Sequence, residues 1–251
     1  MNAIAARRRL IGIAVLAASW LIAASGAPPH ALAQGIASEA GPDGPAQSVY
    51  LPPKGHGPAV LLISGQTGPK AYQKIAADVA ALGYYAVLID GRDVLARGID
   101  GEAVVRKVIT RAQAAPQVVR GKTAVVSFSL GGGGSLAYAT GMSNLVSMVA
   151  AHYPANNFSA AKNTTAFVKK FRVPVLILAA GQDRYKDCCL IENMHAIANE
   201  AKRIGATVEL VVYPEADHGF NLAGKAFRAD DTADAWKRVT AMLTKYQPIA
   251  P

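Results

Sequence analysis

Cysteine is scarce in this chain, since Cys188 and Cys189 are the only two among 251 residues. A disulfide between adjacent residues cannot join distant parts of a fold, so the chain has no framework of structural disulfides. Two buried or half-buried thiols are the expected state, with a strained bond between the neighbours in an oxidising compartment as the alternative. The pair lacks the spacing of a zinc motif and the five histidines are far apart in sequence. No metal is therefore expected.

Motifs for nucleotides and nucleic acids are also missing. The glycines at 131–134 are not followed by the Lys-Ser or Lys-Thr of a P-loop, and Leu136 stands where a dinucleotide fingerprint needs its last glycine. Basic residues gather only weakly, around 169–172 and 202–203, which is typical of a solvated basic face. We therefore expect no cofactor and no nucleic-acid partner, although the net charge of +9 favours anionic substrates.

No apolar run is long enough to span a bilayer. The apolar, uncharged run of residues 10–24 falls short of the roughly 20 residues that a spanning helix needs. Three arginines precede it and Ala31-Leu32-Ala33 follows it, which is the pattern of a signal peptide. We expect residues 1–33 to be removed after Ala33, giving a periplasmic or secreted protein without stable membrane insertion. An uncleaved anchor is the alternative, and the paired arginines leave twin-arginine export open.

The rest of the chain is expected to form one domain. Residues 34–46 are rich in Gly, Pro, Ala and Ser and predict a flexible N-terminal segment. Residues 47–251 alternate short apolar runs, typical of buried strands, with stretches of helical periodicity. This alternation predicts an α/β fold, in which helices flank a mostly parallel sheet on both faces. The expected strands are 59–64, 84–89, 122–127, 145–151, 174–180 and 208–213, and the expected helices are 72–82, 101–114, one from about 130, 190–204 and 232–246.

A nucleophile elbow is the clearest chemical signal. Residues 127–131 read Ser-Phe-Ser-Leu-Gly between a predicted strand and a glycine-rich helix start. The motif G-x-S-x-G places a serine on such a turn, and here Ser127 replaces the first glycine with another small residue. The sequence therefore predicts Ser129 as a nucleophile.

A serine hydroxyl needs a base, and the base needs a carboxylate that orients it. His218 follows the predicted strand 208–213, and Asp183 follows the strand 174–180. Both positions lie at the carboxyl edge of a parallel sheet, where active sites gather. His152, which also ends a predicted strand, is the rival base, and Asp187 and Asp217 are the rival acids.

Two backbone N–H groups are predicted to stabilise the oxyanion that forms on attack. Leu130 lies at the N-terminus of the helix after Ser129, where free donors and the positive end of the dipole face the site. Gln66 follows the strand 59–64, and Gly65 beside it allows close approach of the backbone. His152 and Arg92 are candidates for substrate binding, with a surface salt bridge as the alternative for Arg92.

The elbow, the acid in Gly-Gln-Asp183 and the base in Tyr-Pro-Glu-Ala-Asp-His218-Gly-Phe together resemble the dienelactone hydrolase family over residues 47–246. The resemblance implies a cofactor-free α/β hydrolase that opens esters or lactones through an acyl-enzyme. The founding members use a cysteine nucleophile, a glutamate where Gly65 stands and an arginine shortly after the histidine, where this chain has Asn221 and Leu222. Dienelactone itself is therefore not the expected substrate.

These observations predict an exported serine hydrolase acting on a small ester or lactone, with Ser129 acylated and His218 moving the proton. A small peptidase or acyltransferase with the same three residues is one alternative. A binding protein that keeps the fold without turnover is the other. Whether residues 156–171 form a cap over the site stays open.

Overall fold

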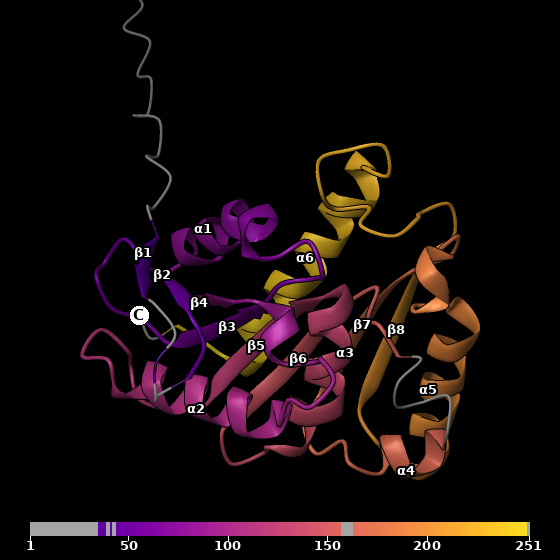
Figure 1. Cartoon of the computed structure of the whole chain (residues 1–251), viewed down its shortest axis with the longest axis horizontal. Coiled ribbons are helices and arrows are strands. Elements are labelled where there is room, and N and C mark those ends of the chain that lie inside the picture. The colour runs from indigo at the N-terminus through magenta and orange to yellow at the C-terminus, as the bar shows by residue number, and fades with distance from the viewer. Residues whose placement is uncertain (1–34, 39–40, 42–43, 157–162, 250–251) are drawn as a thin grey trace, which may run out of the picture. The chain divides into compact units, whose positions relative to one another are not determined.

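The computed structural model describes residues 35–38, 41, 44–156 and 163–249. An eight-stranded sheet runs through them in the order β1-β2-β4-β3-β5-β6-β7-β8 (Figure 1). The strands are β1 (Ile36–Ser38), β2 (Gln47–Tyr50), β3 (Ala59–Ile63), β4 (Tyr85–Ile89), β5 (Thr123–Phe128), β6 (Val146–His152), β7 (Val175–Ala180) and β8 (Val208–Tyr213). Strands β3 to β8 pair in parallel, whereas β1 and β2 pair antiparallel at one edge. The predicted α/β fold with a mostly parallel sheet is confirmed.

Helices cover both faces of this sheet because its central strands are apolar on both sides. Helices α1 (Gln73–Ala81) and α6 (Ala229–Tyr246) pack on one face, with Val60, Leu62 and Val126 of the sheet. The other face carries α2 (Gly101–Ala114), α3 (Ser129–Tyr138), α4 (Thr164–Val168) and α5 (Ile191–Ile204). Two hydrophobic cores result, one on each side of the sheet.

The short helix α4 has no counterpart among the predicted elements. It lies within residues 156–171, the segment that the sequence offers as a possible cap over the site. Its Phe167 and Val168 are buried in the core that α5 also joins, because both present apolar side chains to the same face of the sheet. The described part of this segment therefore packs beside α5, and residues 157–162 lie outside the described chain.

Only part of the N-terminal region for which predictions were made lies among the described residues. Residues 1–33, the predicted signal peptide, lie outside the described residues. Within 34–46, the predicted flexible segment, Ile36–Ser38 form β1 and pair with Gln47, Ser48 and Val49. The reason is physical: an edge strand such as β2 presents unpaired backbone groups that a neighbouring segment can bond. None of the helices in the described ranges is both long and apolar enough to cross a bilayer.

Candidate active site

The sharp turn between β5 and α3 positions Ser129. Phe128 is the last residue of β5 and Ser129 the first of α3, so no linker separates strand from helix. Ser129 makes the turn with a φ of 49°, a left-handed conformation that side-chain-bearing residues rarely adopt. Such strain is tolerated where the surrounding structure holds it, and it gathers at functional sites. This is the backbone shape of a nucleophile elbow.

The glycines after Ser129 let α3 approach the neighbouring loops. A β-carbon on Gly131 would lie 2.4 Å from the Ser64 carbonyl oxygen, and one on Gly133 would lie 1.9 Å from the Ala155 carbonyl oxygen. Both distances are impossible for real atoms, so these positions require glycine. Their role is packing, and the absence of a nucleotide-binding motif is consistent with that.

Ser127 explains how the elbow tolerates a departure from its usual first glycine. Its side chain is fully buried, and its Oγ lies 2.7 Å from Ser135 Oγ and 3.2 Å from the Ala150 carbonyl oxygen. A buried hydroxyl with hydrogen-bond partners carries little cost. The small serine therefore fits a position where a larger side chain would not.

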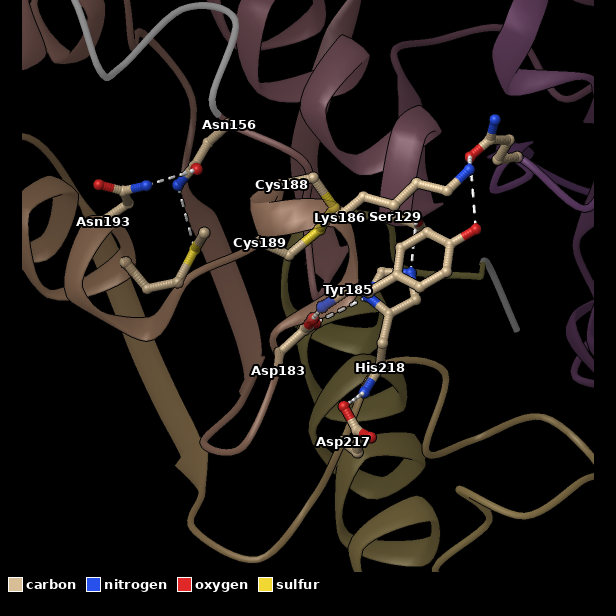
Figure 2. The surroundings of a disulfide bond; sticks show 12 residues. Ser129, Asn156, Asp183, Tyr185, Lys186, Cys188, Cys189, Asn193, Asp217 and His218 are labelled. Atoms are coloured by element: carbon tan, nitrogen blue, oxygen red, sulfur yellow. Dashed lines mark hydrogen bonds and ion pairs between the residues drawn. A yellow bond between two sulfur atoms is a disulfide. The ribbon is translucent and has the colours of Figure 1, made fainter.

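Hydrogen bonds join Ser129, His218 and Asp183 in one chain (Figure 2). Ser129 Oγ lies 2.9 Å from His218 Nε2, and His218 Nδ1 lies 2.7 Å from Asp183 Oδ2. A carboxylate can only accept, so Nδ1 carries the hydrogen and Nε2 is left as an acceptor for the serine hydroxyl. This arrangement has the form that a general base needs.

Burial and a second hydrogen bond fix the Asp183 carboxylate. The residue is 1% exposed, and its Oδ1 accepts a hydrogen bond of 3.0 Å from the Tyr185 N–H. Each oxygen therefore has its own donor, and the side chain cannot rotate without losing both. A rigid carboxylate holds the imidazole of His218 in one orientation.

The rival acids lie elsewhere. Asp217 Oδ1 accepts a hydrogen bond of 2.7 Å from the backbone N–H of His218 (Figure 2). This bond holds the loop and does not involve the imidazole ring. Asp187 is exposed on the 3₁₀ turn Tyr185–Asp187. Of the three aspartates considered, the structure brings Asp183 to the imidazole.

Two tyrosines that the sequence reasoning missed enclose His218. The Tyr185 ring stacks on the imidazole with centroids 4.5 Å apart and planes 12° apart, and the Tyr153 ring meets it edge-on at 4.8 Å. Figure 2 shows the ring of Tyr185 lying over the imidazole. Both could have been found by their place, because Tyr153 directly follows β6 and Tyr185 comes two residues after Asp183. Contacts on two sides limit rotation of the imidazole.

A small cavity opens at Ser129. Its volume is about 210 Å³, and among the residues that line it are Gln66, Thr67, Tyr72, Ser129, Tyr153, Tyr185, His218 and residues 222–226. Burial raises the pKa of the Tyr72 hydroxyl, and burial raises that of Tyr153 well above its usual value, so both are uncharged donors at neutral pH. The cavity therefore combines neutral polar groups with a hydrogen-bonded serine.

Of the two predicted oxyanion donors, Gln66 lines this cavity and Leu130 directly follows Ser129. Gln66 lines the cavity, and its side-chain oxygen accepts a hydrogen bond from Lys186 Nζ at 3.3 Å. Leu130 is the second residue of α3, so its N–H lies in the first turn, where no intrahelical acceptor exists. Gly65 must lack a side chain, because a β-carbon there would meet the Tyr72 hydroxyl at 2.5 Å and Ser129 Cβ at 3.1 Å.

Arg92 and His152 do not join the Ser129 cavity. The Arg92 side chain is 61% exposed and forms an ion pair with Asp90, whose pKa the guanidinium helps to lower against the effect of burial. That is the surface salt bridge weighed from the sequence. His152 is buried beneath a different cavity, because its ring stacks on Phe128 and Tyr153 separates it from His218. Neither residue lines the Ser129 cavity, and their role in substrate binding stays a prediction.

Cys188 and Cys189 form a disulfide with each other, contrary to the expectation of two thiols. Their sulfur atoms and a ring nitrogen of His218 lie within 4.8 Å of one another (Figure 2). The pair is buried with Ala155. The disulfide is therefore part of the wall behind the imidazole.

Comparisons with known proteins agree with this architecture. The profile of the Dienelactone hydrolase family matches residues 96–247. A protein assigned as a carboxymethylenebutenolidase from Methylorubrum extorquens is 26% identical over 217 residues, covering 75% of this chain and 72% of its own.

Solved structures share the fold at low identity. One assigned as a dienelactone hydrolase from Klebsiella pneumoniae has a TM-score of 0.71 at 19% identity, covering 84% of this chain and 99% of its own. Esterase 2 of Thermogutta terrifontis has a TM-score of 0.65 at 17% identity, covering 88% and 94%. The dienelactone hydrolase-like phosphotriesterase P91 from metagenomic libraries has a TM-score of 0.67 at 16% identity, covering 86% and 100%. With the family profile matching more than half of its length, this chain belongs to the dienelactone hydrolase family of α/β hydrolases.

Proposed function

We propose that this hydrolase cleaves carboxylic esters or lactones through an acyl-enzyme on Ser129. One observation carries the proposal: Ser129, at a strained elbow, is hydrogen-bonded to His218, whose other nitrogen donates to the buried Asp183. A base aligned in this way can take the proton of the Ser129 hydroxyl, which makes its oxygen a stronger nucleophile.

The first half of the reaction forms the acyl-enzyme. As Ser129 Oγ bonds to the carbonyl carbon, its proton passes to His218 Nε2, and the carbonyl π electrons move onto the oxygen. The N–H groups of Leu130 and Gln66 are our candidates to hold that oxyanion. Collapse of the intermediate breaks the bond to the leaving alkoxide, which takes the proton from His218.

The second half releases the acid. Water gives a proton to His218 Nε2 and attacks the acyl carbon, and the returning proton restores the Ser129 hydroxyl. Asp183 stays ionised throughout and stabilises the imidazolium that forms twice in each cycle. For a lactone, the leaving alkoxide stays attached to the acyl group, so the product is one hydroxy acid.

The size of the Ser129 cavity favours small acyl groups. A volume of about 210 Å³ is below the 300–1,000 Å³ typical of sites for drug-sized ligands. No arginine is among the described residues that line it, and Lys225 is the one cationic side chain among them. The small volume therefore favours short esters or lactones.

A panel of p-nitrophenyl esters tests the proposal directly. Acetate and butyrate should be cleaved faster than dodecanoate by the wild type, and His218→Ala should abolish the cleavage. Uniform inactivity of a folded protein would instead favour a binding protein on the hydrolase fold. Peptide p-nitroanilides and acceptor alcohols in the same assay separate the peptidase and acyltransferase alternatives, which the same three side chains would serve.

We also propose that the enzyme acts outside the cytoplasm, after removal of residues 1–33. The signal-peptide pattern in the sequence supports this, and so does the disulfide between Cys188 and Cys189, because such bonds persist in oxidising compartments.

A further inference from the structure

A second and larger cavity lies on the face of the sheet that carries α1 and α6. We call it the α1–α6 groove, and its volume is about 870 Å³. Ala81 and Leu82 border it on the side of α1, Trp236 and Val239 on the side of α6, and Val126 and Phe128 of β5 lie beneath. The size is that of a site for a drug-sized ligand, and the walls are mainly apolar as in such sites.

His152 is the polar group in the floor of this groove. It is 4% exposed, its ring stacks on Phe128 with centroids 4.6 Å apart, and its Nδ1 lies 3.3 Å from the Ser127 carbonyl oxygen. Burial lowers the pKa of His152 to about 4, so the ring is neutral near pH 7. Because a carbonyl oxygen only accepts, Nδ1 carries the hydrogen and Nε2 is the acceptor.

Nε2 of His152 has no hydrogen-bond partner among the residues that the structure describes. The atom is not one of the fully buried unpaired side-chain atoms of the described residues, so it is accessible from the groove, where a ligand can supply the donor. A ligand that enters the groove and donates one hydrogen bond would give His152 Nε2 a partner. A neutral hydroxyl meets this need, and the apolar walls of the groove disfavour an ionic donor.

Charge selection supports the same class of ligand. Lys74 and Asp78 are the two charged side chains among the residues that line the groove, and their ion pair of 2.8 Å joins them to each other at its rim. Neither is placed to neutralise an ionic ligand without giving up that contact. The groove therefore favours an uncharged molecule.

The groove is separate from the Ser129 cavity. Tyr153 lines the cavity and Asn221 lines the groove, and a hydrogen bond of 2.6 Å from the Tyr153 hydroxyl to Asn221 Oδ1 joins them into a partition. Ala223 and Gly224 border both spaces. A ligand in the groove would thus leave Ser129 and His218 free.

We propose that the α1–α6 groove is a second binding site, which takes a small uncharged alcohol or phenol with an apolar body and receives its hydroxyl at His152 Nε2. The inference stands apart from the proposed hydrolase activity, because it uses no group of the reaction. Its test can therefore be made in a Ser129→Ala background.

Trp236 makes the test direct, since the chain has only two tryptophans and the other is Trp20. In the full chain carrying Trp20→Phe and Ser129→Ala, tryptophan emission reports on the groove alone. We expect 4-tert-octylphenol to change this emission saturably, and its methyl ether, which cannot donate, to bind about tenfold more weakly. His152→Phe keeps an aromatic ring against Phe128 and should remove the difference between the two compounds.

Ala81→Phe tests the location without touching the buried core, because Ala81 is an exposed residue at the end of α1. It should block binding of the phenol, whereas Ala196→Phe, at an exposed position on α5, should not. Equal affinity for phenol and ether in the parent chain, no saturable change, or a phenol affinity that Ala81→Phe leaves intact would each overturn the proposal.

Discussion

At the scale of single residues, the site depends on one carboxylate being in the right place. Asp183 accepts from His218 Nδ1 at 2.7 Å and from the Tyr185 N–H at 3.0 Å, so it sets which nitrogen of the imidazole faces Ser129. An amide in its place would present a donor as well as an acceptor, and the ring could settle in the wrong tautomer.

Asp183→Asn should therefore lower kcat by about 10⁴-fold, the loss that a wrong tautomer causes in other Ser-His-Asp enzymes. Asp187→Asn is the matched control, because Asp187 is exposed and its φ of 50° suits asparagine equally well. Steady-state kinetics on p-nitrophenyl acetate measure both. Similar losses in the two variants would show that the carboxylate beside His218 has been assigned wrongly.

Tyr185 holds the imidazole by stacking, and its hydroxyl contributes little, since its contact with Gln66 Oε1 is long at 3.5 Å. Tyr185→Phe should keep most of the activity. Tyr185→Ala should lower kcat about ten- to a hundred-fold, because a base that moves by an ångström loses its alignment. If the two variants lost activity equally, the ring contact would not be what matters.

His152 makes folding stability depend on pH. Its folded pKa, lowered by burial to about 4, lies below its ordinary value of 6.5, so between these values the unfolded chain binds a proton that the folded chain does not. The free energy of unfolding should therefore fall as pH drops from 6.5 to 4, by about 3 kcal/mol from this residue. Urea unfolding of wild type and His152→Phe at pH 7 and pH 4.5 measures the difference. Parallel slopes in the two proteins would contradict the assignment of a neutral buried ring.

At the scale of elements, the junction of β5 and α3 shows how far sequence patterns reach. Its motif predicted a strand, a turn and a helix around Ser129, and the structure has them at Thr123–Phe128 and Ser129–Tyr138. The motif predicts this junction because the first turn of the helix packs closely against two other loops, which leaves room only for small residues. It could not show that Ser127 is satisfied by Ser135, since that partner is set by packing.

Gly133→Ala tests this junction. A β-carbon there would fall 1.9 Å from the Ala155 carbonyl oxygen, so α3 must shift and carry Ser129 with it. We expect a loss of about 1–3 kcal/mol in the free energy of unfolding, together with a loss of activity. Gly141→Ala is the control, because its added carbon meets nothing nearer than 3.6 Å. Urea titration compares the two, and a fully stable and active Gly133→Ala would show that α3 can retreat freely.

Loops were harder to predict than strands. The six expected parallel strands are present within about two residues of their predicted ends, because each is a short, mainly apolar run and all but the edge strand β8 are buried on both faces. The aromatic contacts of Tyr185 with His218 and the place of His152 depend on how segments distant in sequence pack together. No local pattern carries that information.

At the scale of the whole molecule, two of the cavities among the described residues matter for function. The smaller contains Ser129, and the larger α1–α6 groove lies behind the partition of Tyr153 and Asn221. The order of Ser129, Asp183 and His218 along the chain predicted the first, since each follows a parallel strand and such strands end at one edge. Nothing in the sequence predicted the second, because a groove between helices depends on their spacing.

Export of the enzyme can be checked on the same molecule. Protein recovered from outside the cytoplasm should begin at Gln34, and its mass should lack two hydrogens for the disulfide. Mass spectrometry of the intact protein, before and after reduction, measures both. A chain that keeps residues 1–33 in that fraction would contradict the proposed cleavage.

The central claim is that Ser129 is the nucleophile, and labelling by a serine-reactive phosphonate measures this most directly. The wild type should gain the mass of one phosphonyl group, located on the peptide that contains Ser129, and Ser129→Ala should gain none. Asp183→Asn should be labelled far more slowly than wild type, since the attack needs the aligned base. Equal labelling of wild type and Ser129→Ala, or no labelling of a folded wild type, would contradict the account.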